Sequence, residues 1–244
     1  MQEFPKSLVL LSSWLVSNGY SYELQQRYRK SGWLKSIGTG AMIKSSDSFL
    51  LSGALAALQL QANIEIHLGG RSALELKGIA HYLQISSPEA TLFVSGNIKT
   101  PSWFTNNKWD VGYKIIRATL FKSDNVGLVD YQDNGIVTKI SSPGRAILEC
   151  LYLCPNYFPL TEAYELMVGL PTLRPNKVQE LLEECTSIKA KRLFLYFAER
   201  AGHSWLKYID KTKVDLGSGN RSLTDRGNGA LISKYNLVLP KDLI

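Results

Sequence analysis

Amide and cationic side chains are concentrated near the amino end of this 244-residue chain. Within six consecutive positions stand Gln25, Gln26, Arg27, Arg29 and Lys30. Glutamine pairs with adenine and arginine with guanine in the major groove of DNA, whereas lysine mostly contacts phosphate. These residue types at this spacing therefore predict a surface that reads duplex DNA.

The same stretch has the pattern of a short helix. Residues 22–30 contain good or neutral helix formers, Ser21 is placed to cap the first turn, and Gly32 is placed to end the helix. Leu24 and Tyr28, four positions apart, share a face that we expect to pack inward. We expect the opposite, exposed side to carry Gln25, Gln26, Arg29 and Lys30.

The flanking segments supply the other elements of a DNA-binding fold. Residues 8–17 predict a preceding helix, and residues 33–37 and 41–44 predict two strands joined by a turn at residues 38–40, Gly-Thr-Gly. Helix, turn, basic helix and glycine hairpin in this order predict a winged helix-turn-helix. Between residues 20 and 45 five Lys and Arg residues outweigh one Glu, which predicts salt-dependent binding to phosphates.

The predicted DNA contacts come from the start of the basic helix, from its polar side and from the wing. They are Ser21, Tyr22, Gln25, Gln26, Arg27, Arg29, Lys30, Lys35, Thr39 and Lys44. The alternative interpretation is an ordinary surface helix and hairpin, which a basic helix standing alone would favour. The order of the four elements favours DNA binding instead.

Composition and charge are consistent with that prediction. An apolar fraction of 45% and a charged fraction of 20% indicate a folded protein, and a net charge of +7 favours polyanionic partners or an acidic surface. No segment approaches the roughly 18 to 20 apolar residues that cross a bilayer, and residues 8–16 lack the features of a secretory signal. We expect a cytoplasmic protein without a membrane partner, in which Cys150, Cys154 and Cys185 are reduced.

After residue 66, predicted strands alternate with predicted helices. We expect strands at residues 64–68, 91–95, 113–121, 128–131, 136–140, 213–216 and 231–239, and helices at 48–59, 71–78, 142–153, 160–168, 175–185 and 187–201. Ser142 is the predicted cap of its helix. The prediction is an α+β (mixed α/β) protein, with a winged-helix domain at 1–66 and a larger α/β domain at 67–244.

Residue types used in catalysis do not form a recognisable set. His67, His81 and His203 are widely separated, and Cys150 and Cys154 share a helix face without a zinc-type spacing nearby. Aspartates at 124, 130 and 133 surround a predicted hairpin. We therefore predict buried cysteines, no catalytic residue, no metal, no cofactor, and a protein that is not an enzyme. A nuclease that uses the winged helix to reach its substrate is the alternative, and a protein-interaction module is a weaker one.

A second basic stretch, residues 189–213, also contains aromatic side chains. Its cations are Lys189, Lys191, Arg192, Arg200, Lys207, Lys211 and Lys213. A second nucleic-acid surface is one interpretation. A helix whose aromatic face packs into the core, flanked by lysines, is the other and the favoured one.

Four sequence segments together resemble a known family. YELQQRYRKSGWLKSIGTGAM, GALAALQ, IEIHLGGRSALELKGIAHYL and SSPGRAILECLYL are similar to the AbiEi antitoxins of type IV, abortive-infection toxin-antitoxin systems, over most of the chain and most strongly in the first 85 residues. The chain departs from the family pattern at Met42, where an aromatic residue is expected, and at Gly144, where an acidic one is more usual.

The resemblance implies a transcriptional autorepressor and antitoxin. Its N-terminal winged helix would bind inverted repeats in the promoter of its own operon, with Gln25 to Lys30 on the DNA-contacting helix and Lys35 to Lys44 on the wing. Its C-terminal domain would counteract a nucleotidyltransferase-like toxin without requiring a stable complex. Symmetric half-sites would require two copies of the chain on double-stranded DNA.

Overall fold

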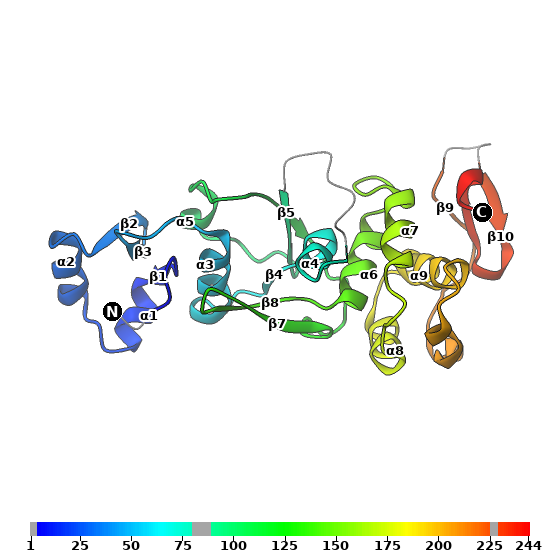
Figure 1. Ribbon diagram of the computed structural model, residues 1–244, viewed down its shortest axis with the longest axis horizontal. Coiled ribbons are helices and arrows are strands. Elements are labelled where there is room, and N and C mark those ends of the chain that lie inside the picture. The colour runs from blue at the N-terminus through cyan, green and yellow to red at the C-terminus, as the bar shows by residue number, and fades with distance from the viewer. Residues whose placement is uncertain (1–3, 80–88, 225–228) are drawn as a thin grey trace. The chain divides into compact units, whose positions relative to one another are not determined.

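The computed structural model describes residues 4–79, 89–224 and 229–244, so His81 lies outside the described residues. The chain forms two compact units. The first contains the described parts of Met1–Leu68, Pro88–Ala118 and Val129–Ile140, and the second those of Gly69–Ser87, Thr119–Leu128 and Ser141–Ile244. Helices and strands are mixed along the chain, which confirms the α+β class (Figure 1).

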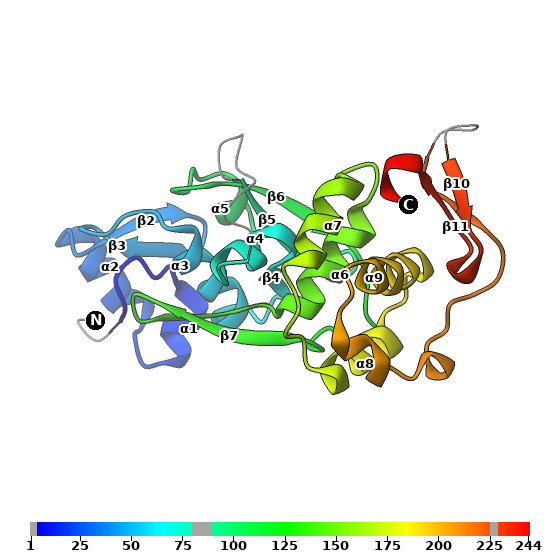
Figure 2. The same cartoon turned by 45° about the vertical axis from the view of Figure 1, so that its right-hand side comes forward.

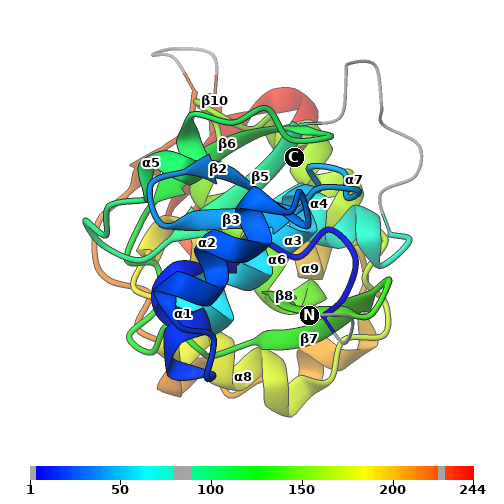
Figure 3. The same ribbon diagram turned by 90° about the vertical axis from the view of Figure 1, so that its left-hand side faces the viewer.

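The first unit begins with two short helices and a three-stranded antiparallel sheet (Figure 3). In chain order the elements are β1 (Leu10–Leu11), α1 (Ser12–Ser17), α2 (Tyr22–Lys30), β2 (Leu34–Gly38) and β3 (Ala41–Lys44). The sheet order is β1-β3-β2, so the predicted hairpin forms and β1 pairs with its second strand. The prediction of a helix over the whole of residues 8–17 is wrong at its start.

Leu10 and Leu11 form a strand, which places their side chains in two different hydrophobic clusters. Alternate residues of a strand point to opposite faces, and Leu10 packs in a cluster with Leu15, Leu34 and Met42 while Leu11 packs in a second cluster. Met42, only 4% exposed, fills the space between β3 and the helices. This packing role accounts for a flexible apolar side chain at that position.

The end of α2 has the geometry that its glycine predicts. Gly32 has a φ of +77°, and the Trp33 N–H donates to the Tyr28 carbonyl at 2.9 Å while the Gly32 N–H donates to that of Arg29 at 3.2 Å. This is the bonding pattern of a Schellman motif, in which glycine adopts the left-handed conformation without strain. The glycine therefore fixes the start of β2 relative to α2.

A larger hydrophobic cluster joins the start of the chain to a five-stranded sheet within the first unit. It contains Val9 and Leu58 from the N-terminal segment together with Leu92 and Phe104. The predicted helix at 48–59 appears as α3 (Leu51–Ala56) continued by the π-helix η1 (Ala57–Gln61). The cluster extends across residue 66, so the N-terminal elements share a core with segments much later in the chain.

The five-stranded sheet has the order β6-β5-β4-β8-β7. Its strands are β4 (Ile66–Leu68), β5 (Glu89–Val94), β6 (Gly112–Arg117), β7 (Leu128–Asp133) and β8 (Ile136–Ser141), and α5 (Ser102–Thr105) lies between β5 and β6 in the chain. The β7–β8 hairpin turns at Asn134 and Gly135, both with positive φ, as the sequence predicts. The strand predicted to reach residue 121 ends at Arg117.

The second unit is mainly helical. Its elements are α4 (Gly70–Leu76), α6 (Pro143–Leu153), α7 (Leu160–Val168), α8 (Pro175–Glu184) and α9 (Ile188–Arg200), followed by β9 (Arg221–Ser222), β10 (Gly229–Ile232) and β11 (Leu237–Pro240). Helix α6 packs against α4, α7, α8 and α9, and Figure 2 shows α6, α7 and α9 side by side. The helix predictions for this region are confirmed, with ends that differ by two residues at most.

Two late predictions are wrong. No strand forms at residues 213–216, because the Asp210 carboxylate accepts the Thr212 N–H and hydroxyl and bends the chain into the 3₁₀ helix η3 (Lys211–Lys213). The strand predicted at 231–239 is two antiparallel strands, β10 and β11, separated by a second 3₁₀ turn, η4 (Ser233–Tyr235). The other 3₁₀ helices are η2 (Ser204–Tyr208) and η5 (Lys241–Leu243).

The start of α6 is built around a close approach of α8. A Cβ added to Gly144 would lie 3.0 Å from Leu181 Cδ1, and one added to Gly127 would lie 2.7 Å from Leu181 Cδ2. Ser142 precedes α6 as predicted, but its side chain makes no capping bond, and its N–H donates to the Gly127 carbonyl at 2.8 Å. A larger residue at position 144 would press on Leu181, so the glycine suits this close packing.

A buried ionic cluster ties α4 to α6 within the second unit. The Glu149 carboxylate, 1% exposed, accepts the Gly70 N–H at 2.8 Å, the Ser141 hydroxyl and the Arg145 guanidinium at 2.9 Å. The Arg145 guanidinium also donates to the carbonyls of Asp124 and Val126. Because each charge has several partners, the cluster is a structural tie. Across the described residues, no helix has the length and apolar character that spanning a bilayer requires.

Candidate nucleic-acid interface

The exposed side of α2 carries an amide and three cations. Gln26, Arg27, Arg29 and Lys30 are all exposed. In the described part of the chain, no acidic side chain forms a salt bridge with these cations. Ser21 caps the helix as predicted, because its hydroxyl oxygen accepts the Leu24 N–H at 3.3 Å. A positive, hydrogen-bonding surface therefore faces solvent.

Gln25 does not belong to this surface, and the prediction that it lies on the exposed side is wrong. Its side chain is 2% exposed, and its amide oxygen accepts the Ser12 hydroxyl at 2.6 Å. Its amide nitrogen donates to the carbonyls of Ser12 at 3.2 Å and Tyr20 at 2.8 Å. Ser12, at the start of α1, supplies the polar partners that turn this position inward, so Gln25 holds α1 and α2 together.

The two predicted wing lysines lie on opposite faces of the hairpin, and protein oxygen atoms hold both. The Lys35 ammonium lies 4.7 Å from the centroid of the Phe49 ring and 3.4 Å from the Asp47 carbonyl oxygen. The Lys44 ammonium donates to the Phe4 carbonyl at 2.6 Å. Thr39 is exposed at the turn. Either lysine must therefore give up an internal contact before it can bind a phosphate.

A narrow groove separates α2 from the turn of the hairpin. It has a volume of about 120 Å³, and its walls include Tyr22 and Arg29 from α2 and Ser36, Gly38 and Gly40 from the hairpin. Tyr22 is 62% exposed. The side of α2 that carries Tyr22 and Arg29 therefore lies beside the hairpin turn, so the two predicted DNA-contacting elements are neighbours.

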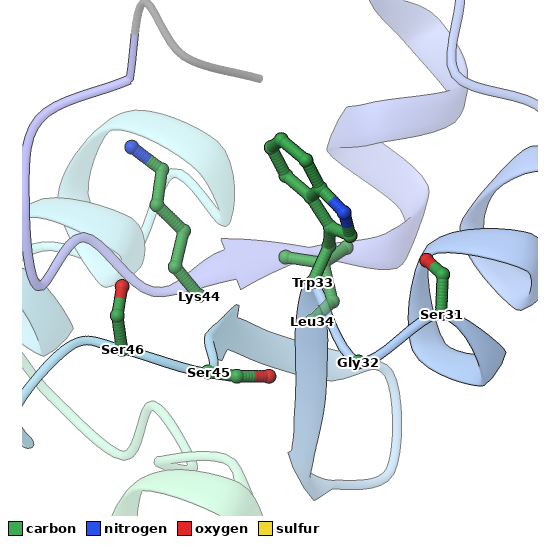
Figure 4. Close-up of a pocket in the computed structure, with 7 residues that line it drawn as sticks. All are labelled: Ser31, Gly32, Trp33, Leu34, Lys44, Ser45 and Ser46. Atoms are coloured by element: carbon green, nitrogen blue, oxygen red, sulfur yellow. The ribbon is translucent and has the colours of Figure 1, made fainter.

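A second hollow, of about 410 Å³, lies at the C-terminal end of α2 and the open end of the hairpin (Figure 4). Its lining residues are Ser31, Gly32, Trp33, Leu34, Lys44, Ser45 and Ser46. Figure 4 shows the Trp33 indole and the Lys44 side chain projecting to the same side of the hairpin. The hollow brings together hydroxyl groups and one ammonium without a carboxylate or imidazole, so its lining contains no acid-base pair.

Glu23 is the one acidic residue on α2, and sequence reasoning gave it no role. It is exposed, and hydrogen bonds from its own backbone N–H and from Ser21, with a contribution from the charge of Arg27, lower the pKa of its carboxyl group. It is therefore ionised at neutral pH. Gln26 and Lys30 follow it by three and seven positions, which places all three on the same exposed stripe. That spacing is visible in the sequence.

Cysteine and histidine have structural roles in the described residues. Burial raises the pKa of Cys150 well above its usual value, that of Cys154 to about 12 and that of Cys185 to about 11. The thiols are therefore protonated at neutral pH, and the prediction of buried cysteines is confirmed. His67 stacks on Phe93. No group of three metal-binding side chains occurs in residues 4–79, 89–224 and 229–244.

The second basic stretch packs into the second unit. Arg192 is 1% exposed and donates to four backbone carbonyls, those of Leu216 (2.7 Å), Gly217 (3.1 Å), Gly219 (2.7 Å) and Asn236 (3.1 Å). Lys191 is also buried, and the Lys189 ammonium donates to the carbonyls of Tyr152 and Cys154. Phe194 and Phe197 are core residues. The structural interpretation of this stretch is confirmed for α9.

Known protein families match both parts of the sequence. Residues 1–85 match the model described as "Transcriptional regulator, AbiEi antitoxin N-terminal domain", and residues 87–240 match "Transcriptional regulator, AbiEi antitoxin, Type IV TA system". No curated protein matches the chain. The crystal structure of RV2827C protein from Mycobacterium tuberculosis is similar to this chain with a TM-score of 0.59 and 14% sequence identity, over 95% of this chain and 86% of that one, which shows a shared fold. The family matches extend over nearly the whole sequence, and the chain therefore belongs to the AbiEi transcriptional-regulator antitoxins of type IV toxin-antitoxin systems.

Proposed function

We propose that this antitoxin represses its own operon by binding inverted repeats in the promoter. The helices α1 and α2 and the β2–β3 hairpin act as a winged helix-turn-helix, with α2 in the major groove and the turn at Thr39 as the wing. The observation that carries the proposal is the exposed side of α2, where Arg27, Arg29 and Lys30 make no salt bridge with a described residue. Two copies occupy the two half-sites, and binding takes place in the cytoplasm.

Nine of the ten predicted contacts remain in the proposal. They are Ser21, Tyr22, Gln26, Arg27, Arg29, Lys30, Lys35, Thr39 and Lys44, of which Lys35 and Lys44 contribute least because protein oxygen atoms already hold their ammonium groups. Gln25 is left out because its amide is already bonded to α1 and the intervening turn. The exposed cations give affinity through counterion release, and Gln26 and Arg29 are long enough to reach base edges.

The test is a titration of a labelled promoter duplex with the full chain. We expect the double variant Arg29→Ala/Lys30→Ala to lose at least about 30-fold in affinity, because one base or phosphate contact contributes about 1–3 kcal/mol. The slope of log K against log salt should become shallower by about 1 to 2. Binding should persist in chelator.

A matched control removes two exposed lysines from the second unit, as Lys207→Ala/Lys213→Ala. This pair should leave affinity and salt slope within about twofold of the unaltered chain, because neither residue belongs to the α2 surface. Unchanged affinity in the Arg29→Ala/Lys30→Ala variant, with its fold intact by circular dichroism, would refute the proposal. Equal losses in the two double variants would refute its assignment to α2.

We further propose that the second unit counteracts a nucleotidyltransferase-like toxin. Deleting residues 1–65 would be a poor test of this division, because the core of the first unit combines Val9 and Leu58 with Leu92 and Phe104. The full-length Arg29→Ala/Lys30→Ala variant, expressed from an unrelated promoter, should still protect cells from the toxin. Loss of protection by a folded variant would contradict this division of labour.

A further inference from the structure

The acidic residue Glu23 is exposed at the start of α2. It is the second residue of the helix, and its neighbour Tyr22 lines the groove beside the turn at Gly38 and Gly40. In a helix-turn-helix the N-terminal residues of the recognition helix contact base edges. Glu23 therefore lies where direct reading of bases is expected, in line with Gln26.

A carboxylate at this point has a specific chemical consequence. It repels every phosphate, so it weakens binding to an arbitrary duplex. In the major groove it needs a donor, and cytosine offers its N4 amine, whereas the amine of adenine lies beside the N7 acceptor, which repels an anion. Guanine and thymine offer only acceptors and a methyl group there. The base that suits a carboxylate is cytosine.

The Glu23 carboxylate has more acceptor positions than its neighbours at the start of the helix can occupy. An ionised carboxylate has about four acceptor positions, and the donors that lower the pKa of Glu23 are its own N–H and Ser21. Both donors lie at the start of the helix, and the side chain is exposed. Acceptor positions therefore remain for a base.

We propose that Glu23 is a specificity-determining residue that accepts a hydrogen bond from the N4 amine of a cytosine, so that each operator half-site carries a C·G pair under the first turn of α2. This inference rests on the proposed function. It adds a residue that discriminates between sequences at the cost of general affinity for DNA. The neighbouring cations supply affinity, and Glu23 supplies selection.

The experiment first obtains the preferred half-site by selection from random duplexes with the full chain. Each base pair of that site is then replaced in turn, and affinities are measured for the unaltered chain, Glu23→Gln and Glu23→Ala. The unaltered chain should lose about 5- to 100-fold at one C·G pair. Glu23→Gln should prefer A·T at that pair, because glutamine pairs with adenine, and Glu23→Ala should not discriminate there. Both variants should bind unrelated duplex more tightly.

The matched control is Asp133→Asn, which removes an exposed carboxylate from the β7–β8 turn of the same unit. It should leave the preference at every base pair unchanged. If both Glu23 variants keep the original preference at every position, or change affinity by the same factor at all of them, the inference is overturned and the proposed function still stands. If the unaltered chain shows no sequence preference in the selection, the proposed function fails and this inference fails with it.

Discussion

The two basic stretches of the chain look alike in the sequence and differ in the structure. Around α2 the cations Arg27, Arg29 and Lys30 are exposed, whereas on α9 Lys191 and Arg192 are buried. Both stretches interleave aromatic residues with positive charge. The difference lies in where backbone carbonyls are available, because residues 216–219 bring three of them to one guanidinium and Asn236 brings a fourth.

Buried cations such as those of α9 stabilise the fold, whereas exposed cations such as those of α2 are available to a partner. A buried cation must be hydrogen-bonded, and its bonds then fix the segments that supply the acceptors. An exposed cation keeps its hydration until a polyanion replaces the counterions around it. Net charge counts both kinds equally. The +7 of the whole chain therefore overstates what the second unit offers to nucleic acid.

The largest expected effect comes from Arg192. Arg192→Met should lower the free energy of unfolding by about 3–5 kcal/mol, because the hydrogen bonds from a buried guanidinium to four backbone carbonyls are lost. Arg192→Lys should be nearly as destabilising as Arg192→Met, since a single ammonium cannot reproduce the several donors of the guanidinium. Urea unfolding of the full chain measures the change.

The matched control for that experiment is Arg29→Met on α2. It should change stability by no more than about 0.5 kcal/mol, as expected of an exposed residue without partners. If Arg192→Met unfolds at the same urea concentration as the unaltered chain, the distinction between the two stretches is lost. The same holds if Arg29→Met is as destabilising as Arg192→Met.

The sequence predicts best where a local rule decides the structure. Ser21 and Gly32 fix the ends of α2, and Asn134 with Gly135 fixes the β7–β8 turn. These predictions need only neighbouring residues. The order of elements in the N-terminal segment follows from several such local signals, which is why most of the candidate interface was predictable.

The predictions that are wrong depend on partners distant in the chain. Leu10 and Leu11 form a strand because β3 offers ladder bonds, and Gln25 turns inward because Ser12 offers two polar groups. Gly144 departs from the family pattern at a position where Leu181 packs closely. Helix periodicity places Gln25 beside Gln26 without indicating which of them has a buried partner. Glu23 is not indicated by the sequence pattern, because the residues that pattern consists of are cations and amides.

A pair of adjacent glutamines gives the second prediction, with a smaller effect. Gln25→Ala should lower the free energy of unfolding by about 1–3 kcal/mol, because the half-buried carbonyls of Ser12 and Tyr20 lose their donor and the buried amide leaves a gap. The base preference of the protein should be unchanged. Gln26→Ala should do the reverse, leaving stability within about 0.5 kcal/mol and weakening operator binding. Thermal unfolding and the duplex titration together measure both.

The opposite results for the two glutamine variants would show that α2 contacts DNA in a different orientation. If Gln25→Ala alters the preferred base at one operator position, its amide must leave Ser12 in the complex, and α2 must rotate on binding. If Gln26→Ala leaves operator affinity unchanged, Gln26 does not face the major groove of the DNA. The surface that contacts DNA must then be centred nearer to Arg27 or Arg29.

The smallest effect is expected for a cation that a protein oxygen already holds. Lys44→Met should reduce operator affinity by no more than about twofold and leave the salt slope nearly unchanged, because its ammonium bonds to the Phe4 carbonyl. Lys30→Met, which removes an exposed cation, should make the slope shallower by about 0.9. Slopes measured between about 50 and 200 mM salt distinguish the two. Equal slopes for the two variants would mean that Lys44 exchanges its carbonyl for a phosphate on binding, and internal hydrogen bonds would then not identify which cations of the first unit are unavailable to DNA.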